Sequence, residues 1–228
     1  MLLLSHLYLA KEALNDFKSK NSKEYYLGSI LPDIRYFSNI LRSSTHFPID
    51  ELNSKLKKLD SDFIKGYFVH LISDKFVSEY NLYNKIRKCF PFIINKLIRD
   101  SIINVCLDLY FLERLKKEKR IELSGVYNIK LKMLGIGKED FEKFCSSTSH
   151  IVSSLSIEVI TQEVFNNNEL KNSWKIRYYL KLSQVVLNSS FLKKYIVKRV
   201  DLIVKEFLVQ FKIRLDLERK NNRYFFEY

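Results

Sequence analysis

The stretch Asp62–Tyr80, DFIKGYFVHLISDKFVSEY, decides how this chain of 228 residues folds. Apolar residues dominate it and no proline interrupts it, so it predicts a long central helix. Gly66, His70 and Asp74 follow one another at steps of four and therefore lie on one face of that helix. The Asp74 carboxylate needs a partner there. Either it shares a metal ion with His70, with Gly66 leaving room for the ion, or it holds a core histidine by a hydrogen bond.

The rest of the chain also favours helices. Only 5 glycines and 3 prolines are present, too few for the frequent turns of a β-sandwich or barrel. We expect one all-α domain over residues 1–228, a multi-helix bundle with a metal-site half in residues 1–120 and C-terminal helices in residues 139–228. Further helices are expected near residues 2–17, 50–59, 92–117 and from 139 onward, with turns at 166–168 and 188–190, a loop-rich stretch at 27–48 and a connector at 121–138 that allows a short strand.

The last predicted helix carries a long apolar stripe with lysines and arginines on its other side. Core packing is the commoner role for such a stripe, and a membrane-surface or partner-binding helix is the alternative. The stripe consists of Ile196, Val200, Ile203, Phe207 and Phe211.

Charge and cysteine content restrict the function classes. With 39 basic and 26 acidic residues, the formal net charge is +13, which favours nucleic acid, an anionic membrane surface or a phosphorylated substrate; solubility of a lysine-rich chain is the alternative. Cys89, Cys106 and Cys145 lack metal-binding spacing and indicate buried free thiols in a reducing compartment. No uncharged apolar run is long enough to span a bilayer, so a soluble, cytoplasmic protein is expected.

Candidate metal ligands cluster in the first third of the chain. Asp33 directly follows a proline, so its carboxylate projects from a fixed loop. His46 lies two residues before another proline, and His6 lies on the first predicted helix. With His70 and Asp74, these residues supply five ligand-type side chains from four separate elements, which is the form of an assembled metal site.

The order of these motifs resembles a known family. The motifs are an early helical His6, the segment Gly-Ser-Ile-Leu-Pro-Asp ending at Asp33, Ser-Thr-His-Phe with His46, and Gly-Tyr-Phe-Val-His-Leu-Ile-Ser-Asp with His70 and Asp74. Over roughly the first eighty residues they resemble the zinc-dependent phospholipase C group, which shares an all-helical fold with the S1/P1 nucleases. The resemblance implies that one metal is bound by Asp33, His46, His70 and Asp74, with Asp74 bridging to a second metal that His6 also binds.

The resemblance also implies a reaction. In that family a metal-activated water attacks a phosphodiester or phosphomonoester, and the aspartate of the Pro-Asp motif, Asp33 here, is a candidate base. After Asp74 this chain offers only His150, which lies beside a run of serines and is expected to neighbour a helix cap. We therefore expect zinc, as one or two ions, and no full three-metal cluster. Manganese and iron also suit a set of histidine and carboxylate ligands.

Two further positions are candidates for the site. Asp108 lies in apolar company on the helix after Pro91, either as a further metal ligand or as an exposed helix position. Arg35 and Arg42 lie between Asp33 and His46, where a guanidinium group can bind substrate phosphate. Of the two, we select Arg35, because surface solvation is the commoner role for Arg42.

These observations predict a metal-dependent phosphoester hydrolase, either phospholipase C-like or nuclease-like. Its substrate would be phospholipid or nucleic acid, and the oligomeric state is not readable from the sequence. The alternative is a non-catalytic basic helical domain that binds nucleic acid or an anionic membrane and keeps a structural or vestigial metal site. Steep salt dependence of binding without hydrolysis would favour that alternative.

Overall fold

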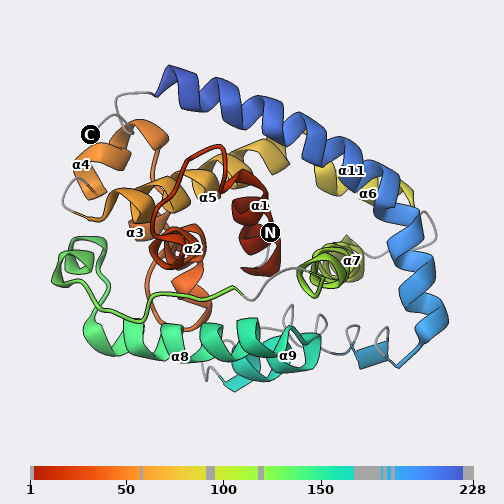
Figure 1. Cartoon of the computed structure of the whole chain (residues 1–228). Coiled ribbons are helices and arrows are strands. Elements are labelled where there is room, and N and C mark those ends of the chain that lie inside the picture. Colours follow the sequence, from red (N-terminus) through yellow and green to blue (C-terminus); the bar gives the residue numbers. More distant parts are fainter. Residues whose placement is uncertain are drawn as a thin grey trace.

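The computed structural model describes residues 3–56, 59–90, 96–117, 121–166, 181, 184–185 and 188–222. These parts contain helices and no strand, which confirms the all-α prediction (Figure 1). The α-helices are α1 (Leu3–Ala13), α2 (Ser22–Ile30), α3 (Arg42–Thr45), α4 (Leu52–Leu56), α5 (Ser61–Glu79), α6 (Leu82–Lys88), α7 (Lys96–Leu115), α8 (Lys138–Ser154), α9 (Ile157–Asn166) and α11 (Ser190–Asn221). The 3-10 helices are η1 (Leu31–Tyr36), η2 (Ile49–Glu51) and η3 (Ile129–Leu134).

The predicted central helix is α5. The Asp60 carboxylate caps the N-terminus of α5 by accepting hydrogen bonds from the backbone amides of Asp62 and Phe63. The helix packs against α1, α2, α6 and α11. Figure 1 shows α1, α2 and α5 grouped in the interior, with α11 along one side and α8 and α9 along the opposite side. Any side chain on the α2 face of α5 is therefore shielded from water.

Two glycines bring α2 and α5 into backbone contact. A Cβ atom on Gly66 would lie 1.9 Å from the Tyr25 carbonyl oxygen, and one on Gly28 would lie 2.1 Å from the Phe63 carbonyl oxygen. Two expectations are corrected by this packing. Gly28 belongs to a helix and not to a loop, and the space beside Gly66 is filled by the backbone of α2, not left open for an ion. The predicted loop-rich stretch at 27–48 is mostly short helices, η1 and α3 included.

The connector and α8 also differ from expectation. Ile129–Leu134 forms the 3-10 helix η3 and not a strand, and its buried residues Leu131 and Leu134 are three apart, which is the period of that helix. Helix α8 begins at Lys138, so the serine run lies inside it and His150 neighbours no cap. Part of the predicted turn at 166–168 lies outside the described residues, because α9 ends at Asn166 and 167–168 are not described.

Helix α11 packs against one side of α5. Its inner stripe is buried as predicted, except that Val204 takes the place expected for Ile203, which is half-buried. The Phe207 ring packs against Phe76 of α5 with ring centroids 5.3 Å apart. The buried stripe consists of Ile196, Val200, Val204, Phe207, Phe211 and Leu215. These residues join one hydrophobic cluster that begins at Leu3.

Two of the three cysteines are buried. Cys106 and Cys145 are buried free thiols as predicted, whereas Cys89 is only partly buried. Burial raises the pKa of the Cys145 thiol to about 12, so this sulfur stays protonated near neutral pH.

Among the described residues, we find no helix that combines the length and the apolar character needed to cross a bilayer.

Candidate metal centre

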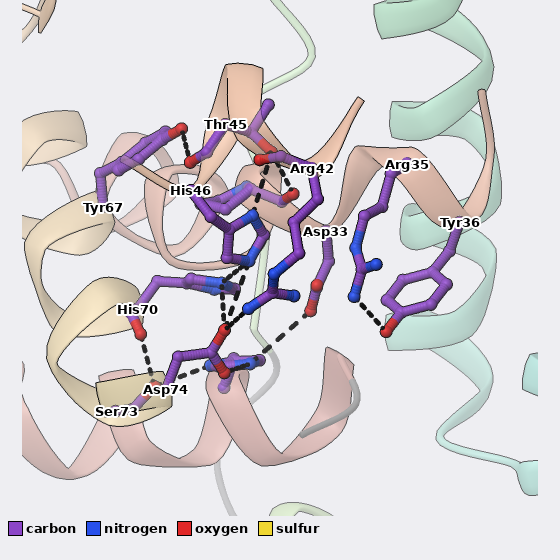
Figure 2. A network of polar contacts seen from close by, with 12 residues as sticks. Asp33, Arg35, Tyr36, Arg42, Thr45, His46, Tyr67, His70, Ser73 and Asp74 are labelled. Carbon is purple, nitrogen blue, oxygen red and sulfur yellow. Dashed lines mark hydrogen bonds and ion pairs between the residues drawn. The ribbon is translucent and has the colours of Figure 1, made fainter. Parts of the chain in front are cut away.

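The five predicted ligands come together in the structure (Figure 2). His6 comes from α1, Asp33 from η1, His46 from the residue that ends α3, and His70 and Asp74 from successive turns of α5. Potential ligand atoms of His6, His70 and Asp74 lie within 4.8 Å of one another, as do those of Asp33, His46 and His70. His6, Asp33 and His70 are buried, and 17% of the Asp74 side chain is exposed. The structure therefore brings the five residues together, and their role as metal ligands stays a prediction.

His70 presents a lone pair to the cluster. Its Nδ1 lies 2.8 Å from the carbonyl oxygen of Ser29, and because a carbonyl only accepts, Nδ1 carries the proton and Nε2 is free to bind a cation. The close packing at Gly66 and Gly28 brings Ser29 to this distance. Burial and the nearby His6 hold the pKa of His70 well below its usual range, although Asp74 opposes the shift. His70 is therefore neutral.

His6 is oriented in the same way through a serine. The Ser73 hydroxyl donates its hydrogen to the His70 carbonyl at 2.8 Å, so it accepts a hydrogen bond from His6 Nδ1, also at 2.8 Å. The His6 Nε2 atom is buried and makes no hydrogen bond. The rings of His6 and His70 stack with centroids 3.8 Å apart. Ser73 thus fixes both the tautomer and the position of His6 against α5.

His46 completes a set of three matching imidazoles. The Thr45 hydroxyl donates to the Pro32 carbonyl at 2.9 Å and accepts from His46 Nδ1 at 3.1 Å, so His46 also presents an unprotonated Nε2. The Nε2 atoms of His46 and His70 are 3.1 Å apart. Two lone pairs at this distance repel each other unless a proton or a cation lies between them. The hydrogen bonds to Thr45 and Ser29 leave the proton on the far nitrogen of each ring.

The two carboxylates face the same nitrogen atoms. Asp74 Oδ1 lies 3.3 Å from His6 Nε2, and Asp74 Oδ2 lies 3.3 Å from His46 Nε2 and 3.9 Å from His70 Nε2. Asp33 Oδ2 is buried without a hydrogen bond and lies 3.7 Å from His6 Nε2. The carboxylate oxygens and the unprotonated Nε2 atoms therefore face one another with no proton of these rings between them.

This arrangement fits a metal ion. Lone-pair donors converge on one small region, and leaving such buried polar atoms without a partner costs roughly 1–3 kcal/mol each. Histidine nitrogen and carboxylate oxygen are ligands that zinc prefers. Each imidazole also donates its other N–H outward to a backbone or hydroxyl oxygen, as metal-binding histidines do in proteins. The outward hydrogen bonds are those to Ser29, Ser73 and Thr45.

Arg42, for which surface solvation was expected, contacts the cluster. Arg42 Nη2 lies 2.7 Å from Asp74 Oδ2, and about half of the Arg42 side chain is exposed (48%). Figure 2 shows Arg42 reaching toward Asp74, whereas Arg35 points to Tyr36. Arg35 donates to the Tyr36 hydroxyl at 2.7 Å and lies over its ring. The sequence feature that could have identified Arg42 as a site residue is its position one helical turn before His46.

An open groove leads to the cluster. It has a volume of about 440 Å³ and is lined by cationic, acidic and apolar side chains. Its lining includes His46 and Asp74, so these two candidate ligands border the groove. The lining residues are Arg42, His46, Phe47, Leu71, Asp74 and Lys75, together with residues 48–50.

The two remaining histidine and aspartate candidates lie elsewhere. Asp108 is buried on α7 and belongs to neither group of converging ligand atoms in the described part of the chain, so its role as a ligand stays a prediction. His150 is exposed on α8, with Nδ1 2.7 Å from Glu163 Oε1. An exposed pair of this kind contributes little to stability.

Comparison with known proteins agrees with the site. The model of the family described as zinc dependent phospholipase C matches residues 5–77, a segment that contains all five converging ligands. No curated protein and no solved structure matches the chain significantly. The matched segment begins one residue before His6 and ends three residues after Asp74, so it coincides with the elements that build the cluster. As the motifs predicted, residues 5–77 are therefore similar to the zinc-dependent phospholipase C family.

Proposed function

We propose that this protein hydrolyses a phosphodiester with the help of zinc bound by His6, Asp33, His46, His70 and Asp74. The observation that carries the proposal is the convergence of three unprotonated Nε2 atoms on two carboxylates. At a coarser level, the family match and the cluster support a metal-dependent phosphoesterase. Bound zinc supplies a Lewis acid and lowers the pKa of a water molecule toward neutrality.

Three residues around that ion would have different roles: binding metal, accepting a proton and binding phosphate. Each oxygen of Asp74 faces a different histidine, so each could hold zinc together with that histidine. Asp33 has a buried oxygen without a hydrogen bond, so it can accept a proton from the attacking water or serve as a ligand. Arg42 can exchange its ion pair with Asp74 for the phosphate of a substrate in the groove.

The lining of the groove favours a phospholipid over a nucleic acid. Arg42 and Lys75 offer positive charge for a phosphate, while Phe47 and Leu71 offer apolar surface beside it. A phospholipid has an anionic phosphodiester next to apolar chains, and the groove matches both parts. A nucleic acid backbone would leave the apolar wall in contact with a charged strand, which is unfavourable.

The test combines metal content with hydrolysis. We expect the purified protein, equilibrated with zinc and freed of excess, to hold at least one ion per chain by plasma mass spectrometry. It should hydrolyse short-chain phosphatidylcholine, and a chelator should abolish the activity. His70→Ala should lose both properties, whereas the matched control His150→Ala should keep both. Arg42→Gln should raise KM for the lipid more than Arg35→Gln does.

Two results would contradict the proposal. If the folded parent protein bound no zinc, manganese or iron, the cluster would be a structural hydrogen-bonded core. If metal bound but neither phospholipid nor oligonucleotide were cleaved, the site would be structural or vestigial. Preferential cleavage of an oligonucleotide would retain the metal chemistry and replace the substrate.

A further inference from the structure

Helix α11 carries a second apolar stripe on its outer face. Its inner stripe packs into the core, but six large apolar side chains between 41% and 77% exposed lie on the opposite side. Their steps of four and seven residues keep them on one face of the helix. Figure 1 shows α11 running along an outer edge of the molecule. The outer stripe consists of Phe191, Tyr195, Leu202, Val209, Ile213 and Leu217.

Positive charge accompanies this outer stripe. The structure describes every residue of α11, and among its exposed charged residues six are basic and one, Glu206, is acidic. Three of the basic ones also pair with carboxylates: Lys205 with Asp201, Lys212 with Glu12 and Lys220 with Asp216. The Glu206 carboxylate lies 3.4 Å from the Lys85 ammonium group, which offsets its charge. Four of the lysines repeat at steps of four, seven and seven and form a row beside the apolar residues. The exposed basic residues are Lys194, Lys198, Arg199, Lys205, Lys212 and Lys220.

We propose that this outer face of α11 docks on an anionic phospholipid bilayer. A helix that lies in a membrane interface combines an apolar stripe with lysine and arginine along its polar side, and α11 has both. Anionic headgroups attract each basic residue near the surface enough to raise affinity about fivefold. A nucleic acid would engage the lysines but leave Leu202 and Val209 facing water, so the bilayer accounts for both features.

A second copy of this chain fits the face less well. A two-stranded coiled coil needs two apolar rows that alternate along the seam. The row through Tyr195, Leu202 and Val209 has charged residues in all but one of the companion positions. These positions are Lys198, Lys205 and Lys212 in one register and Arg199, Glu206 and Ile213 in the other.

One end of this helix lies beside the groove of the metal centre. Glu218, near the C-terminal end of α11, accepts from Lys75 at 3.4 Å, and Lys75 lines the groove. Glu218 lies on the buried side of α11, with 13% of its side chain exposed, so this contact is made by the side of the helix opposite to the outer stripe. The docking surface shares no residue with the metal site, so it stands or falls independently of the hydrolytic activity.

The experiment measures vesicle binding with the metal removed. The full chain is mixed, with a chelator present, with vesicles of phosphatidylcholine alone or of phosphatidylcholine with phosphatidylserine, and bound protein is separated by flotation. We expect binding to the phosphatidylserine vesicles that weakens at high salt. Lys198→Glu/Lys205→Glu should reduce affinity by at least about tenfold. The control Lys132→Glu/Lys143→Glu makes the same charge change at exposed positions on η3 and α8 and should bind almost normally.

A second pair of variants tests the apolar part. Leu202→Gln/Val209→Gln should weaken binding severalfold, and Val126→Gln/Ile129→Gln, at equally exposed apolar positions, should not. Circular dichroism checks that all variants fold. Failure to bind phosphatidylserine vesicles at low salt, or equal losses in both charge variants, would overturn the proposal. A dimer in light scattering that Leu202→Gln/Val209→Gln dissociates would assign the face to a second copy instead.

Discussion

At the scale of single residues, the imidazole tautomers of the metal centre depend on oxygen atoms outside it. Ser73 is the sharpest case, because it relays a hydrogen bond from His6 to the His70 carbonyl and contacts no other member of the cluster in this way. Without Ser73, nothing in the relay would hold the His6 proton on Nδ1. The ring would then be free to turn or to protonate Nε2, which is the atom that faces Asp74.

Ser73→Ala is therefore expected to weaken zinc affinity by about 10- to 100-fold, which is the usual cost of losing such an outer partner. The measurement is a zinc titration in competition with a chelator of known affinity. Ser78→Ala removes a hydroxyl from an exposed position of the same helix and serves as the matched control. Equal affinities for the two variants would show that the serine does not orient His6.

A second residue, Asp62, ties the turn before α2 to the start of α5. Its carboxylate accepts the backbone amides of Lys20 at 2.9 Å and Asn21 at 2.6 Å, and the Lys65 ammonium lies 2.7 Å away. Burial raises the pKa of Asp62, but the hydrogen bonds from Lys65, Asn21 and Lys20 outweigh it, so its pKa is lowered from the ordinary 3.8. Folding therefore favours the ionised form.

Asp62→Asn should destabilise the protein by about 1.5–3 kcal/mol at neutral pH, the usual worth of hydrogen bonds to a charged group. Because the pKa is lower in the folded state, this stabilisation is complete above pH 3.8 and is lost as the pH falls through the folded value. Urea unfolding at neutral and acidic pH checks both parts. A difference between parent and variant that stays constant down to the lowest pH would refute the electrostatic part.

At the scale of helices, the contact between α2 and α5 controls the metal centre. Gly66 admits the Tyr25 carbonyl where any side chain would collide with it, and the same contact sets the distance from Ser29 to His70. Gly66→Ala must push the two backbones apart. We expect a loss of about 3 kcal/mol in the free energy of unfolding, at the upper end for overpacked cores.

The same variant should also bind zinc more weakly, because the Ser29 carbonyl would no longer hold the His70 proton. Unfolding in urea and zinc titration measure the two effects. Gly125→Ala is the control, since a Cβ there meets no atom within 4 Å. If Gly66→Ala were as stable as the control, the helices would have room that the structure does not show.

At the scale of the whole molecule, bound metal should stabilise the fold. The ligands come from α1, η1, the end of α3 and α5, so an ion would bind the native state and connect segments from residue 6 to residue 74. Free zinc at about 100 times its dissociation constant should add about 2.7 kcal/mol. For a chain of this size that raises the melting temperature by about 5–10 °C.

Differential scanning calorimetry with and without zinc measures this shift. His70→Ala removes one ligand common to both groups of ligand atoms and should show little or no shift, whereas His150→Ala should respond as the parent does. An unchanged shift in His70→Ala would place the stabilising ion elsewhere on the molecule.

The sequence by itself determined the features that depend on local periodicity. His70 and Asp74 share a face because one helical turn separates them, and the inner stripe of α11 follows from apolar residues at steps of three and four. The motifs that contain His6, Asp33 and His46 resemble a known family, and the match over residues 5–77 confirmed that resemblance. The alternation at Ile129–Leu134 allowed a strand, but the chain forms a 3-10 helix that buries every third residue.

Only the tertiary structure decided how these residues meet. The contact of Gly66 with α2, the ion pair of Arg42 with Asp74, and the hydrogen bonds that orient His6 and His70 all join residues far apart in the chain. The outer stripe of α11 is likewise defined only once the core has taken the opposite face. Periodicity is a property of neighbouring residues, whereas the direction of a histidine lone pair depends on the position of backbone atoms in another helix.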